Sequence, residues 1–385
     1  MKKILTACAA ILFSVLLPLS NALAQAMPTP NIAAKSWLLL DVTSGQTIAS
    51  DNPDLRIEPA SLTKLMTVYL AFDALTDKKL TLDTMITVSE RAWKVDRSSS
   101  KMFIEPKTPV SFGDLLTGVI VQSGNDASVA VAEAVAGTED AFVVLMNREA
   151  QRLGMKSTHF ANSHGLPDPN NYSTAHDLAL LASALVANHP EEYKMYSIKS
   201  FTYNKIKQQN RNRLLWLDPT VDGMKTGHTQ AAGYCLIASA KRPNGSGERR
   251  LISVLLGATS DQQRAQESQQ LLNWGFQNFD TVKLYAKGVP VETIPIWKGA
   301  QSQIKLGFNH DIYVTVPRGS AEKMKPVLVR RDPLVAPVAQ NSQVGTVKMV
   351  ADGKTLAEFP LLALEQVNQA SIFGRAWDSV RLWIK

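Results

Sequence analysis

The pattern of hydrophobic and polar residues divides the chain into two parts of different texture. Between about residues 32 and 279, apolar residues recur both at helical spacing and in short strand-like runs. From about residue 281 onward the runs are short and alternating, and Pro and Gly separate them. The pattern therefore predicts an α+β domain followed by a small all-β domain. A chain of 385 residues is long enough for two such cores.

Several elements of the first part can be placed from the pattern alone. An apolar run without Gly or Pro follows Pro59, a residue that is favoured at the start of a helix. Apolar side chains fall on nearly every face of this run, which predicts a buried helix. The other predicted elements are strands at 37–41, 233–240 and 251–257, helix-like stretches at 112–121 and 127–136, and a helix from Asp261 to Phe276.

The second part predicts a β domain of roughly ninety residues that ends near Leu364. It contains no catalytic constellation of residues, so we interpret it as a stalk or a protein-contact module. The predicted organisation is a leader at 1–26, an α+β domain at 27–280, an all-β domain at 281–366 and a terminal helix at 367–385.

The two ends of the chain carry localisation signals. Two lysines precede an apolar run over residues 4–19, and small residues follow with the spacing of a secretory signal peptide, with cleavage after Ala24 or Ala26. The alternative is an uncleaved membrane anchor, but the run is short and Pro18 interrupts it. We therefore expect export of the mature protein.

In the last fifteen residues the apolar side chains, among them two Trp and one Phe, recur at helical spacing and form a single stripe. The segment also carries an excess of positive charge. This composition is typical of a helix that lies in a membrane interface without crossing it. The alternative is a helix docked on the protein's own surface. We expect this helix to attach the exported protein to a membrane surface.

Charge and cysteine content exclude several classes of function. The formal net charge is +7, and it becomes +5 once Lys2 and Lys3 leave with the leader. No basic patch is interleaved with aromatic residues, so we do not expect nucleic-acid binding. Loss of Cys8 leaves Cys235 alone in an apolar strand pattern, so no internal disulfide is expected. With no H-E-x-x-H helix, no metal site is predicted, and we expect no cofactor.

The pattern S-x-x-K occurs four times, and its context selects one occurrence. Ser61 and Lys64 open the predicted buried helix, where residues three apart share a face, so the lysine can reach the serine hydroxyl. The others lie in polar or turn-rich segments and are interpreted as surface residues: Ser98/Lys101, Ser302/Lys305 and Ser320/Lys323.

Two further motifs follow in the chain. Ser123 and Asn125 form S-x-N between two helix-like stretches, which taken alone would be an ordinary turn. K-T-G occurs once, at 225–227, before a strand–turn–strand pattern, and Lys and Gly on an exposed sheet edge let a ligand approach the backbone. In this order, S-x-x-K, S-x-N and K-T-G are the parts of a serine acyl-transfer site in which lysine activates the serine.

With these motifs the chain resembles the low-molecular-weight penicillin-binding proteins, specifically the D-alanyl-D-alanine carboxypeptidases of the bacterial periplasm. The resemblance covers nearly the whole chain, including 59–67, 162–166, 172–177 and 210–216. Position 124 is Gly, where the related class A β-lactamases have Asp, and this fits the carboxypeptidase branch. The resemblance implies a penicillin-binding/β-lactamase-like catalytic domain, with an antiparallel sheet beside a helical cluster. It also implies a location in the periplasm, where the terminal helix attaches the enzyme peripherally to the outer face of the inner membrane.

The resemblance implies a serine-type carboxypeptidase that removes the last D-alanine from peptidoglycan pentapeptides through an acyl-enzyme on Ser61. Lys64 is the expected base. The ordinary pKa of lysine, about 10.4, is too high for this role, and we expect burial and the nearby Lys225 to lower it. β-Lactams are expected to acylate Ser61.

The remaining roles concern substrate binding. We expect Lys225 and Thr226 to bind the terminal carboxylate, with a second charge from Arg211 by resemblance. The backbone N–H groups of Ser61 and of His228, which follows Gly227, are expected to form the oxyanion hole. The His228 side chain contacts substrate or lies on the surface, and the sequence leaves both possibilities open.

Ser123 is expected to relay a proton to the leaving D-alanine, and Asn125 to bind the peptide amide and order the site. Three other functions remain possible, two of which use the same site residues and one of which has no catalytic activity. They are a β-lactamase, an endopeptidase that cuts peptide crosslinks, and a catalytically silent wall-binding protein.

Overall fold

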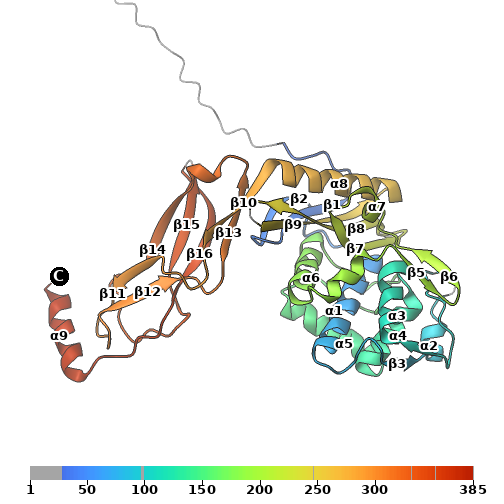
Figure 1. Ribbon diagram of the computed structural model, residues 1–385, viewed down its shortest axis with the longest axis horizontal. Coiled ribbons are helices and arrows are strands. Elements are labelled where there is room, and N and C mark those ends of the chain that lie inside the picture. Colours follow the sequence, from blue (N-terminus) through green and yellow to red (C-terminus); the bar gives the residue numbers. More distant parts are fainter. Residues whose placement is uncertain (1–27, 97–98, 246, 331, 352, 385) are drawn as a thin grey trace, which may run out of the picture.

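The computed structural model describes residues 28–384 except 97–98, 246, 331 and 352. The predicted signal peptide lies outside these residues. The described chain is elongated (Figure 1): a first lobe built from residues 28–278, a second lobe built from 279–364, and a terminal helix, α9 (Ile372–Trp383), at the end far from the first lobe.

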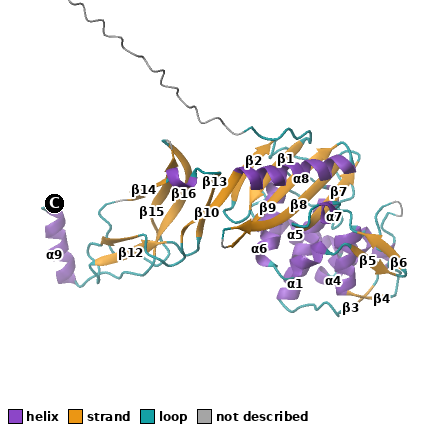
Figure 2. Cartoon of the chain, turned by 45° about the horizontal axis from the view of Figure 1, so that its top comes forward, coloured by secondary structure: helices purple, strands orange, loops and turns teal. Residues whose placement is uncertain are grey.

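The first lobe is organised around an antiparallel sheet with the strand order β2-β1-β9-β8-β7. Side chains of its strands alternate between two cores, so that Leu38 and Leu40 face the helical cluster while Trp37 and Leu39 face α8. α8 covers one face and the helical cluster around α1 and α6 covers the opposite face (Figure 2). The strands are β1 (Ser36–Asp41), β2 (Gln46–Asp51), β7 (Val221–Thr229), β8 (Gly233–Asn244) and β9 (Gly247–Ala258), and α8 spans Asp261–Asn278.

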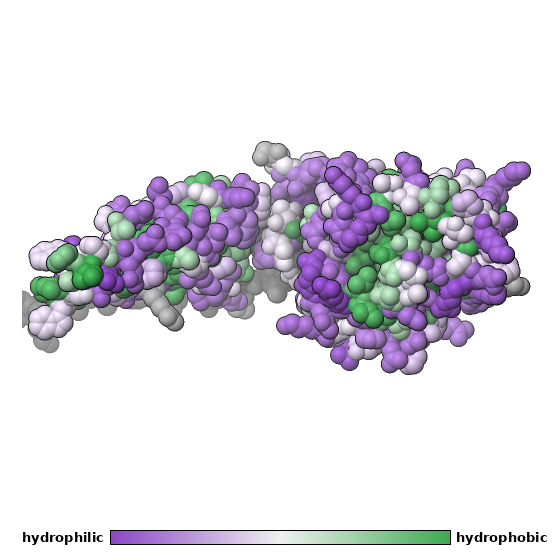
Figure 3. Space-filling model, turned by 90° about the horizontal axis from the view of Figure 1, so that it is seen from below, coloured by the Kyte–Doolittle hydropathy of each residue, from purple (hydrophilic) through white to green (hydrophobic). Residues whose placement is uncertain are grey.

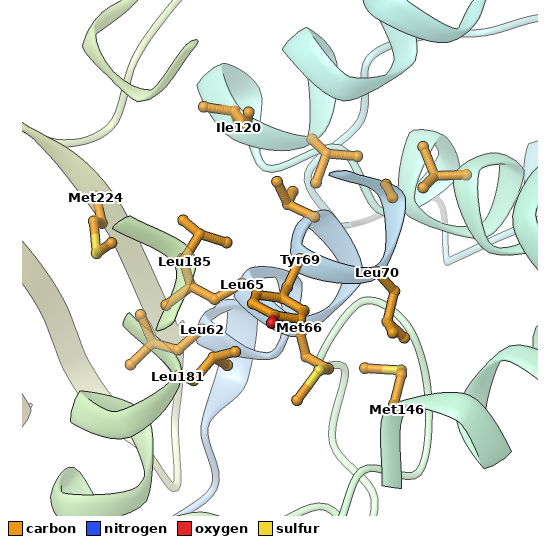
Figure 4. Close-up of a cluster of buried hydrophobic side chains, with 14 of the residues drawn as sticks. Leu62, Leu65, Met66, Tyr69, Leu70, Ile120, Met146, Leu181, Leu185 and Met224 are labelled. Carbon is orange, nitrogen blue, oxygen red and sulfur yellow. The ribbon is translucent and has the colours of Figure 1, made fainter. Parts of the chain in front are cut away.

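The helical cluster surrounds α1 (Lys64–Thr76), which is preceded by a 3₁₀ turn, η1 (Ala60–Thr63). Ten of the thirteen residues of α1 are buried, which confirms the predicted buried helix. Figure 4 shows α1 side chains packed against Ile120, Met146 and Leu185. The longer neighbours are α3 (Phe112–Thr117), η2 (Gly118–Gln122), α4 (Asn125–Ala136), α5 (Glu139–Arg152) and α6 (Ala175–Asn188).

Shorter elements complete the first lobe around the cluster. They are β3 (Met85–Thr87), α2 (Glu90–Trp93), β4 (Pro109–Ser111), η3 (Glu192–Ser197), β5 (Ser200–Tyr203), β6 (Ile206–Gln209) and α7 (Leu214–Leu217). β3 pairs with β4 and β5 pairs with β6, so these segments form two small hairpin-like sheets beside the helices.

The second lobe consists of strands around its own apolar core, as predicted. One sheet has the order β11-β12-β16-β15-β14, and β10 pairs with β13. β10 begins at Phe279, directly after α8 and two residues before the predicted boundary. The elements are β10 (Phe279–Tyr285), β11 (Glu292–Pro295), β12 (Gln303–Gly307), β13 (Ile312–Pro317), η4 (Ala321–Lys323), β14 (Lys325–Arg330), β15 (Gln343–Ala351) and β16 (Lys354–Ala363).

Helix α9 leaves its apolar side chains in solvent. Phe373 is 87% exposed and Trp383 is 89% exposed, and hydrophobic residues are visible at this end of the surface (Figure 3). The helix touches the second lobe through its polar side, where Asp378 Oδ2 accepts a hydrogen bond from Lys298 N at 2.6 Å. No helix within the described ranges is both long enough and apolar enough to span a bilayer.

Candidate active site

The three motifs meet in one cleft of the first lobe, with a volume of about 510 Å³. It lies where η1, the start of α4 and the edge strand β7 come together. Seven of the nine predicted site residues line it: Ser61, Ser123, Asn125, Arg211, Thr226, Gly227 and His228. The other two, Lys64 and Lys225, are buried behind its wall. The structure therefore brings together segments that lie up to about 170 residues apart.

Ser61 and Lys64 lie across one turn, because η1 leads directly into α1. Lys64 Nζ is 3.1 Å from Ser61 Oγ, and the lysine side chain is fully buried. Burial, followed by the charge of Arg211, lowers the pKa of Lys64 to about 7, although the Asp126 carboxylate opposes this shift. A large share of the amine is therefore neutral at neutral pH and able to accept a proton.

Two carbonyl oxygens orient the Lys64 amine. Nζ donates to Asn125 Oδ1 at 2.6 Å and to the backbone oxygen of His164. A neutral amine has two N–H bonds and one lone pair, and these two oxygens can only accept. The lone pair is therefore directed at the third neighbour, the hydroxyl of Ser61.

The S-x-N motif lies at the junction between η2 and α4. Ser123 ends η2 in the left-handed conformation, with φ at 65°, and Asn125 begins α4. The buried Ser123 Oγ has no hydrogen-bond partner among the described residues, so the hydroxyl is available to a substrate. The next residue, Asp126, accepts hydrogen bonds from the backbone N–H groups of Met102, Phe103 and Ile104, which fixes the segment that follows the cleft residues Ser99 and Ser100.

K-T-G lies on β7 at the edge of the sheet, as predicted, and this edge is mostly buried except where Thr226, Gly227 and His228 line the cleft. η1 and η3 pack on β7, and Lys225 is only 3% exposed. A side chain at Gly227 would come within 3.1 Å of Pro59 O, so glycine allows η1 to approach the strand. The glycine thus has a packing reason as well, and because Gly227 also lines the cleft, close approach of a ligand to this strand stays a prediction.

The expected effect of Lys225 on Lys64 is also corrected. Burial lowers the pKa of Lys64 as predicted, but the cation that assists is Arg211. Lys225 is itself buried, and burial followed by Lys64, Arg211 and Arg264 lowers its pKa well below the usual value. The repulsion between the two buried lysines lowers the pKa of Lys225, whereas Arg211 is the cation that lowers the pKa of Lys64.

The far end of the cleft contains charged residues that the sequence patterns did not indicate. Arg264, from α8, donates to the backbone oxygens of Gly227 and Cys235 at 2.9 and 3.3 Å, and also to Asp261. The ring of His228 lies 4.1 Å from the ring of Tyr234, and both residues line the cleft. The His228 side chain is thus part of the cleft wall.

His164 was also missed as a site residue, although it lies in a segment that carries the family resemblance. Its contact with Lys64 is made by a backbone oxygen, which leaves no signature in side-chain patterns. Within the described ranges, no group of three His, Cys, Asp or Glu side chains is placed to hold a metal ion.

Two family profiles together match most of the chain. D-alanyl-D-alanine carboxypeptidase (peptidase S11) matches residues 23–260, and the C-terminal domain of penicillin-binding protein 5 matches 279–369. Among curated proteins, the D-alanyl-D-alanine carboxypeptidase DacC of Escherichia coli is 44% identical over 384 residues, covering 98% of this chain and 95% of the relative.

Solved structures agree with this similarity. Penicillin-binding protein 5 of Haemophilus influenzae has a TM-score of 0.86 at 43% identity and covers 89% of this chain and 100% of its own. Penicillin-binding protein D2 of Listeria monocytogenes, in a cefotaxime-bound form, has a TM-score of 0.59 at 32% identity and covers 65% of this chain and 100% of its own.

Proposed function

The chain belongs to the D-alanyl-D-alanine carboxypeptidase family and is a serine peptidase of the low-molecular-weight penicillin-binding type, and we propose that it releases the terminal D-alanine of peptidoglycan stem peptides through an acyl-enzyme on Ser61. The observation that carries this assignment is the 3.1 Å contact between Ser61 Oγ and the buried Lys64 Nζ. A serine hydroxyl needs such a base to become a nucleophile at neutral pH.

In the acylation step, neutral Lys64 removes the proton of Ser61 as Oγ attacks the carbonyl carbon between the last two D-alanines. The negative charge on the carbonyl oxygen would be stabilised by the backbone N–H groups of Ser61 and His228. The C–N bond then breaks, and Ser123 would relay the proton taken up by Lys64 to the departing amine of D-alanine, which returns Lys64 to its neutral form. Asn125 would hold the peptide amide on the acyl side.

The substrate's terminal carboxylate is best matched by Thr226 and Arg211, which both line the cleft. Lys225 was expected to supply a point charge there, but it is buried behind the cleft lining, so Arg211, which lines the cleft, is the better placed charged partner. Water then attacks the ester and releases the shortened peptide, which restores Ser61. The same ester formed with a β-lactam would block the enzyme for as long as it resists water.

The direct test is release of D-alanine from diacetyl-L-Lys-D-Ala-D-Ala by the purified mature protein. Peptide mapping after benzylpenicillin treatment should place the adduct mass on Ser61, and Ser61→Ala should lack both activities. An adduct on another residue, or acylation of the alanine variant, would contradict the assignment. Turnover of nitrocefin faster than turnover of the peptide would instead favour the β-lactamase alternative.

For localisation, we propose export by the N-terminal leader and attachment of α9 to the periplasmic face of the inner membrane. Support for attachment comes from the solvent exposure of the apolar α9 side chains and from the position of α9 at the end of the molecule away from the cleft (Figure 1). The contact of Asp378 with the second lobe lies on the other side of the helix and leaves that face free.

A further inference from the structure

Glu139 is a buried carboxylate outside the cleft that contacts the loop behind the catalytic lysine. It is the first residue of α5, where an acidic side chain is ordinarily favoured by the helix dipole and stays in solvent. Here it is 5% exposed. Its Oε1 accepts hydrogen bonds from Ser163 N at 3.2 Å and Ser163 Oγ at 2.8 Å, and its Oε2 accepts one from Arg91 at 2.6 Å.

The loop held by Glu139 lies along the catalytic helix. Ser163 O accepts a hydrogen bond from Thr67 Oγ1 at 2.6 Å, and the next carbonyl oxygen, that of His164, accepts one from Lys64 Nζ. Thr67 and Lys64 lie three residues apart on α1 and therefore share a face. Two successive carbonyls of the loop are thus fixed to one face of α1, while Glu139 fixes the N–H of the same segment from the other side.

The His164 imidazole completes the contact in a neutral form. Its Nδ1 accepts a hydrogen bond from Leu166 N at 3.1 Å, so the proton of the neutral ring is on Nε2, which lies 3.4 Å from Glu139 Oε1. Burial, followed by the charge of Lys64, lowers the pKa of His164 to about 4.

Glu139 is the charged member of this network. Burial opposes its ionisation, but His164, the two hydrogen bonds from Ser163 and the charge of Arg91 outweigh burial and lower its pKa. At neutral pH the loop is therefore held by an ionised acceptor, which binds donors more strongly than a neutral one.

We propose that Glu139 is a positioning residue for acylation: by holding the Ser163–His164 peptide, it keeps the His164 oxygen where it orients the Lys64 amine toward Ser61. This inference rests on the proposed role of Lys64 as the base. Without Glu139, the carbonyl can leave the amine, and the Lys64 lone pair is then no longer directed at the hydroxyl. A displacement of about 1 Å at such a contact can slow a reaction by about 100-fold.

The test measures acylation of the full mature chain by benzylpenicillin under single-turnover conditions, which separates the dissociation constant of the initial complex from the acylation rate constant. Glu139→Ala is expected to lower the rate constant by about 10- to 100-fold and leave the dissociation constant unchanged. Glu139→Gln should recover most of the rate, because its amide oxygen can still accept from Ser163.

The matched control is Glu149→Ala. Glu149 is on the same helix, is similarly buried and pairs with an arginine, Arg152, but contacts neither Ser163 nor His164. It should lose stability and keep the wild-type acylation rate. If Glu139→Ala loses stability in the same way but acylates at the wild-type rate, Glu139 is only structural and the proposal is overturned.

Two further variants keep the outcome decisive. If Glu139→Ala does not fold, Ser163→Ala removes one of the two hydrogen bonds and should slow acylation by about 2- to 10-fold; a wild-type rate would overturn the proposal. Lys64→Ala distinguishes failure of the proposed base from failure of the proposed positioning role. Normal acylation by Lys64→Ala would refute Lys64 as the base. Loss of acylation in Lys64→Ala together with a normal rate in Glu139→Ala would refute only the positioning role of Glu139.

Discussion

Asp41 and Arg249 form an ion pair at 2.7 Å in which both side chains are buried, at the junction between the two lobes. The same Asp41 oxygen, Oδ2, accepts hydrogen bonds from the hydroxyls of Thr281 and Thr315, which belong to β10 and β13 of the second lobe. One carboxylate of the first lobe is therefore shared with the second lobe, so the two lobes are linked by more than the chain connection.

Asp41→Ala should destabilise the protein by about 3–5 kcal/mol, because it leaves the Arg249 guanidinium buried without its partner. Unfolding in urea, followed by fluorescence, measures the loss. The control is Asp77→Ala, which breaks an exposed pair with Lys79 and should cost at most about 1 kcal/mol. Equal losses in the two variants would show that the junction does not depend on this ion pair.

Acylation by benzylpenicillin should depend on pH with an acidic limb near the pKa of Lys64, about 7. Only the neutral amine can accept the serine proton, so the rate should rise with pH through this value and level off above it. The charged or titratable groups near this amine are Arg211, Asp126, Lys225 and His164. A rate that falls as pH rises through 7 would contradict Lys64 as the base.

Arg211→Ala tests the electrostatic origin of that value. Because Arg211 lowers the pKa of Lys64, its removal should raise this pKa and move the acidic limb to higher pH. The rate should then be low at pH 7 and recover as the solution becomes more alkaline. Arg213→Ala, which removes another cleft arginine that does not contribute to the Lys64 shift, should leave the position of the limb unchanged. If the acidic limb of the pH–rate profile does not move in Arg211→Ala, the low pKa of Lys64 is due to burial and not to the charge of Arg211.

Gly165→Ala should damage both stability and acylation. Gly165 has a φ of 83°, and an added Cβ would overlap the backbone oxygen of Ala60, the neighbour of Ser61. Gly154→Ala is a matched control, because Gly154 has a φ of 79° with no atom within 4 Å of the added carbon. It should cost only the backbone strain, about 1–2 kcal/mol, and keep the acylation rate. Similar acylation rates in the two variants would contradict this account of the loop.

Phe373→Glu combined with Trp383→Glu should abolish sedimentation of the protein with vesicles that contain anionic phospholipid. The two rings are the most exposed aromatic side chains of α9, and charged replacements cannot enter the interface. D-alanine release from a soluble peptide should remain unchanged, since the cleft is in the other lobe. Vesicle binding equal to that of the wild-type protein would show that α9 does not provide the attachment.

Parts of the fold and site follow from short stretches of sequence. The pairing of Ser61 with Lys64 depends only on one helical turn, and the apolar run after Pro59 marks the buried helix. K-T-G before a strand–turn–strand pattern correctly placed residues 225–227 on a sheet edge. The alternating runs after residue 281 were sufficient to predict a second, all-β core.

The sequence by itself thus determined the two domains, the chemical groups of the site and the local contact between nucleophile and base. The tertiary structure decided which groups surround that base: the backbone oxygen of His164, the amide of Asn125, the charge of Arg211 and, behind the loop, Glu139. It also decided that η1 and η3 pack on the K-T-G strand and leave only part of it facing the cleft. The reason is physical: local geometry follows from neighbouring residues, whereas burial and electrostatic environment depend on segments 60 to 150 residues away that meet only when the chain packs.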